Sequence, residues 1–370
     1  MGGYSVKTLK KSTLALIGVY LFTVIMNLIS WISTEFTDWY ADYIYPVFSN
    51  TFSRLTSPIP FSLGEALIGA GIVLVAAGLP VFIIVIIVKK EKRKKIAVGT
   101  GKFVLWVVGV IICLINLNYF MLNHCTDFSE RYYKNSDYSS EAFMNAYVRV
   151  TDELIELAPQ MNRDEDGYFV MTDDIGSVSG STMQKLGTAY PQFKGYYPKP
   201  KKMLFPKIRS QMGLSGFFAP YTMEANYNAI MHDSNIPFTA CHELAHLKGV
   251  AKENEANFIA FLACIGSDSA EYRYSGYLMA FSYMFGDAPD TEAADMILSS
   301  IPNEAWQDMI FLKPEIREKV EESAIIPTEV ISEVSDAVVD AQIKLNGVED
   351  GIKSYKRVNE LIMDYYSSEG

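Results

Sequence analysis

Two of the chain's four histidines flank a glutamate in the segment H-E-L-A-H, which begins at His242. On a helix, residues four positions apart lie on one face, so the imidazoles of His242 and His246 would point to the same side. Glu243 would reach the same opening. This is the H-E-x-x-H pattern, in which two imidazoles bind zinc and the carboxylate takes a proton from metal-bound water. The pattern predicts a catalytic Zn²⁺ site, with Glu243 as the general base.

Two simpler explanations of the pattern are weaker. Histidines can lie on the surface of an amphipathic helix without a metal, but with so few histidines a chance match is expected on the order of a few times per thousand. A structural zinc site would use cysteine pairs, and the sequence contains no C-x-x-C. Cys241 precedes the motif and points to another side of the helix.

A catalytic zinc takes three protein ligands and keeps one position for water. The motif is expected on a helix capped by Thr239, which runs to Lys248 and ends at Gly249. A second helix is expected over residues 252–262, and its first turn offers Glu253 and Glu255. These two glutamates are two positions apart and face different sides, so only one of them can point at the metal.

The segment from Glu253 to Asn257 resembles the E-x-x-x-D pattern of the gluzincin branch of zinc metallopeptidases. The resemblance implies that Glu253 is the third ligand and that Asn257, in the place of the Asp, supports an imidazole through its amide oxygen. The chain departs from the pattern in this Asn, and in the short spacing of six residues between His246 and Glu253. Glu255 remains the alternative ligand.

Gly249 follows His246 by three residues and resembles the H-E-x-x-H-x-x-G turn of the metzincins. Their third ligand would fall on Lys252, which cannot bind zinc, so the site is placed nearer the gluzincins. Glu253 and Asn257 share a helix face, whereas the corresponding partner of Glu255 is the apolar Ile259.

Three nearly uncharged apolar runs occupy the first third of the chain, over about residues 13–32, 66–88 and 103–122. Each is close to the ~20 residues that a helix needs to span a bilayer. The first run is too long for the apolar part of a signal peptide, and no small-x-small cleavage site follows it. The sequence therefore predicts a membrane anchor over residues 1–123 and a second domain over residues 124–370.

Charge predicts the orientation of the three spans. Lysines precede the first span, and a strongly basic loop, residues 89–95, joins the second and third, whereas the loop between the first and second spans is acidic. The positive-inside rule then places the N-terminus in the cytoplasm and the second domain outside it, in a multi-pass protein of a bacterial cell membrane. Sensor metalloproteases with the same motif that face the cytoplasm are a poorer match to this charge pattern.

The two predicted parts differ in charge. Residues 1–123 carry 11 Lys and Arg against 5 Asp and Glu, and since the whole chain is at −11, residues 124–370 carry −17. An acidic domain is an improbable partner for nucleic acid. The expected partners are the lipid bilayer and a peptide or protein substrate. Four cysteines are too few for a disulfide framework, and Cys241 and Cys264 are expected to be buried thiols.

The second domain is expected to belong to the α+β class, mainly helical and zincin-like with a small antiparallel sheet. A hairpin over residues 215–221 and 225–231 precedes the motif helix, and its edge strand would bind extended peptide by backbone pairing. Tyr274 or Tyr277 would be an oxyanion donor, although core packing is the commoner role of either tyrosine; His232 is expected in a loop rather than as a ligand. A helix is predicted to run to about residue 157, with Ser139 or Ser140 as its cap and an apolar face formed by Phe143, Tyr147, Val150 and Leu154. The other predicted elements are helices over residues 181–186, 271–285, 328–345 and 352–366, a strand over 168–171 and a loop over 175–180.

The arrangement as a whole resembles a family of uncharacterised bacterial membrane proteins that carry three N-terminal spans and a zincin-like domain of unknown function. The resemblance rests on the segments 216–220, 239–264 and 346–355, and it implies a metal site without naming a substrate. The predicted function is that of a membrane-anchored zinc metallopeptidase. The alternative is an extracytoplasmic sensor or binding protein with a degenerate or structural metal site, which would have no use for Glu243.

Overall fold

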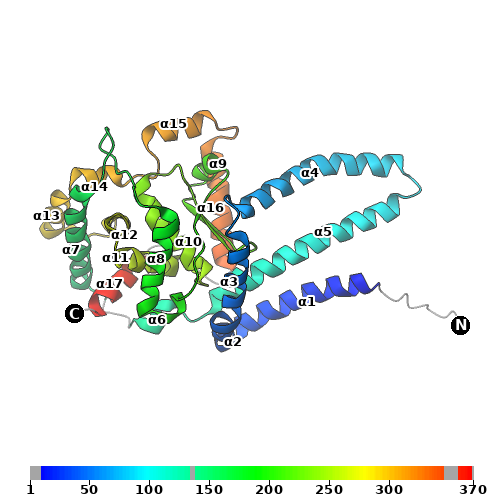
Figure 1. The fold of residues 1–370 in the computed structure, drawn as a ribbon, viewed down its shortest axis with the longest axis horizontal. Coiled ribbons are helices and arrows are strands. Elements are labelled where there is room, and N and C mark those ends of the chain that lie inside the picture. Colours follow the sequence, from blue (N-terminus) through cyan, green and yellow to red (C-terminus); the bar gives the residue numbers. More distant parts are fainter. Residues whose placement is uncertain (1–9, 134–137, 346–356, 369–370) are drawn as a thin grey trace. The chain divides into compact units, whose positions relative to one another are not determined.

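A computed structural model describes residues 10–133, 138–345 and 357–368 (Figure 1). The chain forms two compact units. The first comprises Met1–Tyr45 and Ala66–Cys125, and the second comprises Pro46–Glu65 and Thr126–Gly370. Of the segments that carry the family resemblance, 346–355 lies outside the described residues, as does the start of the helix expected from residue 352.

Three helices are long and apolar enough to cross a membrane, as the sequence predicts, and they lie in the first unit except for the first three residues of α4. They are α1 (Lys11–Ile32), α4 (Leu63–Val88) and α5 (Arg93–Ile115), which continues through a π-helical turn (Asn116–Phe120) and a 3-10 turn (Met121–His124). The third helix begins ten residues before the predicted span. The basic residues that precede the apolar run are themselves helical, so the helix is longer than the run. Two short elements, α2 (Thr34–Trp39) and a π-helical turn (Tyr40–Ile44), follow α1.

Helices α1 and α5 pack against each other. The side-chain amide of Asn27 donates to Oδ1 of Asn116 at 2.8 Å, and the hydroxyl of Tyr20 donates to the carbonyl of Leu105 at 2.8 Å. The ring of Tyr20 lies over Gly109, where an added Cβ would come within 3.0 Å of it. A small residue and a polar pair are the usual means by which apolar helices associate in a bilayer.

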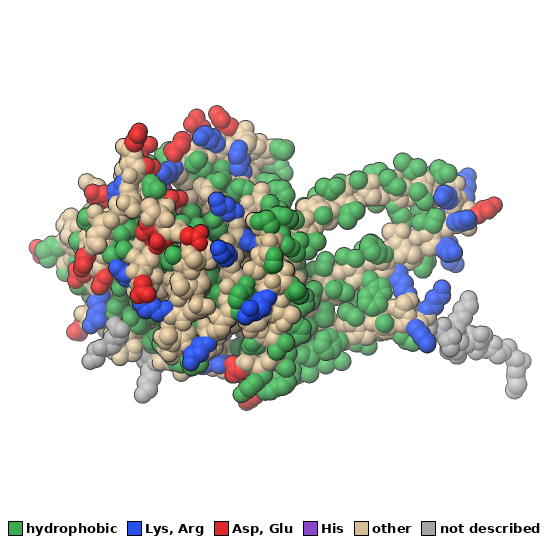
Figure 2. Space-filling view, viewed as in Figure 1, with side chains coloured by type: hydrophobic (Ala, Val, Ile, Leu, Met, Phe, Trp, Pro, Cys, Tyr) green, Lys and Arg blue, Asp and Glu red, His purple; other side chains and the backbone are tan. Residues whose placement is uncertain are grey.

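The surface chemistry differs along the chain (Figure 2). Hydrophobic side chains cover α4 and α5, with Lys and Arg at the loop that joins them, whereas Asp and Glu side chains are scattered over the second unit. This distribution is the one that the sequence predicts from its charges.

The second unit is mostly helical and is built around one hydrophobic core. Helices α10, α11 and α12 form its centre, and α7, α8 and α17 cover them. At Gly276 of α12 an added Cβ would come within 2.6 Å of Cβ of Cys264, so α11 and α12 are in close contact. The helices of the unit are α3 (Tyr45–Thr56, whose first residue lies in the first unit), α6 (Phe128–Tyr132), α7 (Ser140–Leu157), α8 (Ile175–Ala189), α9 (Pro206–Gln211), α10 (Ile236–Leu247), α11 (Glu253–Ile265), α12 (Ala270–Phe285), α13 (Glu292–Ser300), α14 (Asn303–Asp308), α15 (Pro314–Glu322), α16 (Thr328–Leu345) and α17 (Arg357–Ser368).

A three-stranded sheet lies against α10. Its strands are β1 (Lys201–Lys202), β2 (Gly216–Ala219) and β3 (Glu224–Tyr227), in the order β1-β3-β2. The predicted hairpin is confirmed, because β2 pairs with β3 in antiparallel register. The sheet is mixed rather than antiparallel, because β1 pairs with β3 in parallel.

Residues 46–65, which lie between α1 and the apolar part of α4, are held to the second unit by a buried carboxylate. Glu224 accepts hydrogen bonds from the backbone N–H of Leu63 and of Gly64, the latter at 2.8 Å, and pairs with the ammonium of Lys201. Lys201 also donates to the carbonyl of Thr56 at 2.8 Å. The domain boundary predicted at residue 123 assigns residues 46–65 to the membrane anchor, whereas they belong to the second unit. The local sequence contains no signal for this long-range contact.

Several local predictions agree with the structure and others are wrong. Ser139 caps α7, and α16 has the predicted bounds. The strand predicted over residues 168–171 is wrong: the segment forms a single bridge, from Phe169 to Arg163. The loop predicted over residues 175–180 is also wrong, because Asp174 caps a helix there despite its glycines and serines.

Candidate metal centre

Helix α10 carries the H-E-x-x-H motif and is buried along nearly its whole length. The helix begins earlier than predicted. Asn235 precedes its first residue and Pro237 stands in its first turn, where proline's missing N–H costs nothing, so Thr239 lies inside the helix rather than capping it. Gly249 has a φ of 97°, a conformation that favours glycine, and turns the chain after α10 as predicted.

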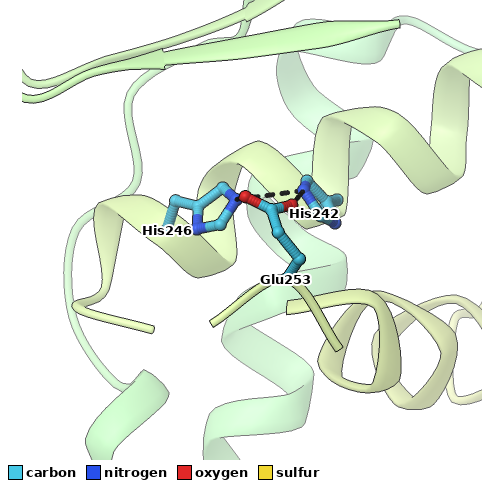
Figure 3. Close-up of side chains that lie close together, drawn as sticks. All are labelled: His242, His246 and Glu253. Carbon is cyan, nitrogen blue, oxygen red and sulfur yellow. Dashed lines mark hydrogen bonds and ion pairs between the residues drawn. The ribbon is translucent and has the colours of Figure 1, made fainter. Parts of the chain in front are cut away.

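The tight turn after α10 brings Glu253, the first residue of α11, to the two histidines (Figure 3). Nε2 of His242 lies 3.3 Å from Oε2 of Glu253, and Nε2 of His246 lies 3.6 Å from Oε1. The two imidazole nitrogens are 3.0 Å apart. The structure thus brings together the three residues that the sequence predicts as ligands.

These separations suit a zinc ion. Atoms bound at about 2.0–2.1 Å to a tetrahedral zinc lie about 3.3–3.4 Å from one another. The observed separations of 3.0, 3.3 and 3.6 Å bracket that value. Two imidazoles and one carboxylate are also a donor set that catalytic zinc sites use, with one position left open.

Each histidine has a neighbour on its second nitrogen. Nδ1 of His246 lies 2.6 Å from the carbonyl oxygen of Val250, so this nitrogen is an N–H donor, and Nε2 faces the site, where it can bind a metal once it has lost its own proton. Asn257, one turn beyond Glu253, lies beside His242, whose pKa is lowered by burial although the Asn257 side chain opposes that shift. Nδ1 of His242 and the amide nitrogen of Asn257 are both buried with no hydrogen-bond partner among the residues described.

Without a metal, the three groups balance one another's charge. Burial alone would lower the pKa of His246, but the facing Glu253 carboxylate raises it to about 9. Burial opposes ionisation of Glu253 as well, yet the charge of His246 and hydrogen bonds from both histidines hold the pKa of Glu253 well below its usual range. Burial, together with the charge on His246, lowers the pKa of His242.

Glu243 lies beside this cluster, under the sheet. Its side chain is 5 % exposed, and its Oε2 has no hydrogen-bond partner in the part of the chain that the structure describes. Burial raises the pKa of Glu243 to about 8, a shift that the charge of His246 opposes. The carboxylate lies against Gly216 at the start of β2, where any Cβ would overlap it. The sequence identifies Glu243 but not this glycine, because contact across 27 residues leaves no local signal.

Glu255, the alternative ligand, points away from the histidines. Its carboxylate accepts hydrogen bonds from the backbone N–H of Ser129 at 3.0 Å and from its hydroxyl at 2.6 Å, at the start of α6. Burial and the charge of Asp127 raise the pKa of Glu255 to about 7. The neighbouring Lys252 pairs with Asp127 at 2.6 Å. The first turn of α11 therefore makes two sets of contacts: Glu253 faces the two histidines, and Glu255 binds Ser129 at the start of α6.

The other candidate residues form a separate buried cluster. The hydroxyl of Tyr274 donates to Asp308 at 2.5 Å, and Arg163 pairs with the same carboxylate at 3.0 Å. His232 contacts Ser234 through Nδ1 at 2.6 Å. The hydroxyl of Tyr274 is thus engaged in the core, and the ring of Tyr277 packs on Phe261.

Cys241 and Cys264 are buried free thiols, as predicted.

Strand β2 passes over the motif helix. The ring of Phe218 stacks on that of His246 at 6.2 Å between centroids. Within the described residues, β2 pairs with β3 on one side and lies at the edge of the sheet on the other. The arrangement therefore combines a potential metal centre, a buried carboxylate and an open strand edge.

The fold and the site define a mostly helical protein with three membrane-length apolar helices and a His/His/Glu cluster able to hold a metal ion. The chain belongs to the family described as "Protein of unknown function (DUF3810)", whose model matches residues 40–363. The match covers the second and third apolar helices and the whole cluster. No curated protein and no solved structure matches the chain.

Proposed function

We propose that the protein is a membrane-anchored zinc metallopeptidase. The observation that carries this proposal is the convergence of His242, His246 and Glu253, at ligand-like separations, beside the buried carboxylate of Glu243. A structural metal site has no use for such a carboxylate, which distinguishes the proposal from a sensor or binding role.

The proposed chemistry divides among these residues. His242, His246 and Glu253 would hold the zinc ion, which would supply a Lewis acid that lowers the pKa of water to about 7 and polarises a carbonyl. Glu243 in its ionised form accepts the proton of the attacking water and then donates it to the leaving amine. An extended peptide that pairs with β2 would bring its backbone across the mouth of the site.

We further propose that the second unit lies outside the cytoplasm. The basic loop between α4 and α5 supports a cytoplasmic position for that loop. The association of residues 46–65 with residues 126–370 supports the passage of α4 and α5 through the bilayer as a pair, because two segments separated by two membrane crossings must lie on one side; the choice of side rests on the basic loop alone.

The test uses the purified full chain in detergent and a matched pair of variants. Glu243→Gln should retain stoichiometric zinc and lose peptide hydrolysis by about 10²–10⁴-fold, the usual contribution of a general base. Glu292→Gln, an exposed glutamate on α13, should leave both unchanged. Absence of bound zinc in the native chain, or full hydrolysis by Glu243→Gln, contradicts the proposal. Surface protein fragments compared between wild-type and Glu243→Gln cells would identify substrates.

A further inference from the structure

The second unit is fixed to the start of an apolar helix. Gly64 and Glu65 stand in the first turn of α4, and the uninterrupted apolar run begins at the next residue, Ala66. The buried Glu65 carboxylate pairs with Nε of Arg209 at 2.8 Å and accepts from the backbone N–H of Leu204. Residues 204–209 therefore lie beside the start of this apolar helix.

One short strand joins this place to the candidate metal centre. At the last residue of β2, Cβ of Ala219 lies 2.8 Å from where a Cβ on Gly64 would be, and at the first residue Gly216 lies against the carboxylate of Glu243. Three residues of strand span about 10 Å. When the contact of Gly64 with Ala219 and that of Gly216 with Glu243 are added to this length, Glu243 lies on the order of 15 Å from the start of the apolar helix. This distance does not depend on how the second unit is tilted relative to the membrane.

Exposed apolar side chains gather around the same place. Leu204, Phe205 and Ile208, in and before α9, are 41–52 % exposed. The segment that leads into α16 is tied to α9 by Gln211, whose side-chain amide donates to the carbonyl of Ile326 and the hydroxyl of Thr328. This segment and the first turns of α16 add four more exposed apolar residues, namely Ile325, Ile326, Val330 and Val334. We call these seven residues the α9–α16 apolar face. Lys207 of α9 is exposed beside this face, whereas the guanidinium of Arg209 is paired with Glu65.

Scattered apolar residues on a surface are ordinary, but a cluster of them indicates a binding surface. Here the binding partner is inferred to be the lipid bilayer, because the apolar run of α4 starts at Ala66, one residue after Glu65, which is paired with α9. Apolar side chains accompanied by Lys and Arg are the composition of segments that lie in the lipid headgroup layer.

We propose that the α9–α16 apolar face lies in the headgroup layer, and that the site consequently acts on the juxtamembrane segment of membrane-anchored polypeptides. The substrate class rests on the proposed peptidase function. An extended peptide rises about 3.3 Å per residue, so a site within ~15 Å of the bilayer reaches a bond roughly five residues from a membrane anchor. Anchoring also raises the local concentration of substrate at the site.

The position of the face is tested on the full chain in phosphatidylcholine and phosphatidylglycerol vesicles. A bimane label on Ile208→Cys should be quenched by lipids that carry a nitroxide near the headgroup, after subtraction of the signal from the labelled native chain. The same label on Val148→Cys, an exposed apolar position on α7, should show little quenching. Equal quenching at the two positions overturns the membrane contact.

The substrate class is tested in the same vesicles with a random-sequence peptide library, either free or attached to a lipid through one end by a short or a long Gly-Ser spacer. The short-spacer peptides should be cleaved at least about tenfold faster than the free ones, through their effective concentration at the surface. Equal cleavage of free peptides, or cleavage of long-spacer peptides alone, overturns the substrate class. Failure to cleave any peptide with zinc bound refutes the peptidase function and the substrate class with it, while the quenching result still decides the position of the face.

Discussion

At the residue scale, the motif spacing predicts which side chains can share a helix face but not which buried neighbour each one meets. Glu253 and Asn257 were predicted on one face of the second helix, and the structure places both near the histidines. The partner of Glu255 could not be predicted, since Ser129 is 126 residues away. Helical periodicity fixes direction, whereas long-range contacts depend on the complete fold.

The two glutamates of α11 are therefore expected to respond differently to substitution. Glu253→Ala should lose zinc, Asn257→Ala should weaken zinc binding by about 10–100-fold, and Glu255→Ala should retain zinc. Glu255→Ala should instead lower the free energy of unfolding by about 1–3 kcal/mol, because the N–H and hydroxyl of Ser129 lose their acceptor. Zinc titration and thermal unfolding measure the two effects. Loss of zinc in Glu255→Ala with retention in Glu253→Ala would exchange the assignments.

Gly216 is expected to be essential for the position of Glu243. In Gly216→Ala the new Cβ would overlap the carboxylate, so either Glu243 or β2 must shift. We expect zinc binding to persist and peptide hydrolysis to fall by about 10²-fold or more, as for a displaced general base. Gly286→Ala is the matched control, since a Cβ there meets nothing within 4 Å and its φ is −72°. Equal hydrolysis by the two variants would contradict the prediction.

Zinc binding is expected to release protons. In the metal-free site the pKa of His246 is raised to about 9, so the imidazole is protonated at neutral pH and must lose its proton to coordinate a metal. The affinity should rise by about tenfold per pH unit for each proton displaced, and level off above about pH 9. Calorimetry in two buffers of different ionisation enthalpy counts the protons released. A constant affinity between pH 6 and pH 9 would show that His246 binds no proton in the free protein.

At the element scale, predictions succeed where capping and periodicity act within one segment. The Ser139 cap and the apolar periodicity of α7 are local, and both are found. Only the part of helix α8 over residues 181–186 was predicted, because the glycines and serines before it resemble a loop, although the cap at Asp174 and burial against the core allow the helix to begin at Ile175. Strand β1 has two residues and pairs in parallel with β3, so it has no periodicity to detect.

The buried pair between β1 and β3 is expected to stabilise the attachment of residues 46–65. In Lys201→Met the Glu224 carboxylate loses its countercharge while it stays 2 % exposed, and Thr56 loses its donor. Removal of one partner of a buried ion pair typically costs about 3–5 kcal/mol. The exposed Lys202→Met is the control and should be close to neutral. Urea unfolding monitored on the full chain in detergent measures the difference, and equal stability of the two variants would mean that the pair contributes nothing.

At the scale of the whole molecule, hydropathy and charge predict the three apolar helices, because each signal is the sum over some twenty residues and does not depend on tertiary contacts. The membership of residues 46–65 in the second unit could not be predicted, since it depends on Glu224 and Arg209, each about 145–160 residues away along the chain. This association nevertheless constrains topology, because it requires residues 46–65 and 126–370 to share one side of any membrane that α4 and α5 cross.

The orientation itself is expected to follow the basic loop. A reporter cysteine at Ser140, at the start of α7, should react with a membrane-impermeant maleimide added to intact cells, whereas one at the exposed Ala97, at the start of α5, should react only after the cells are opened. The native chain, labelled in parallel, provides the background from its four free cysteines. The reverse pattern would place the metal centre in the cytoplasm. Labelling of both positions from outside would mean that α4 and α5 do not cross the bilayer as a pair, and the shared unit of residues 46–65 and 126–370 would then need another explanation.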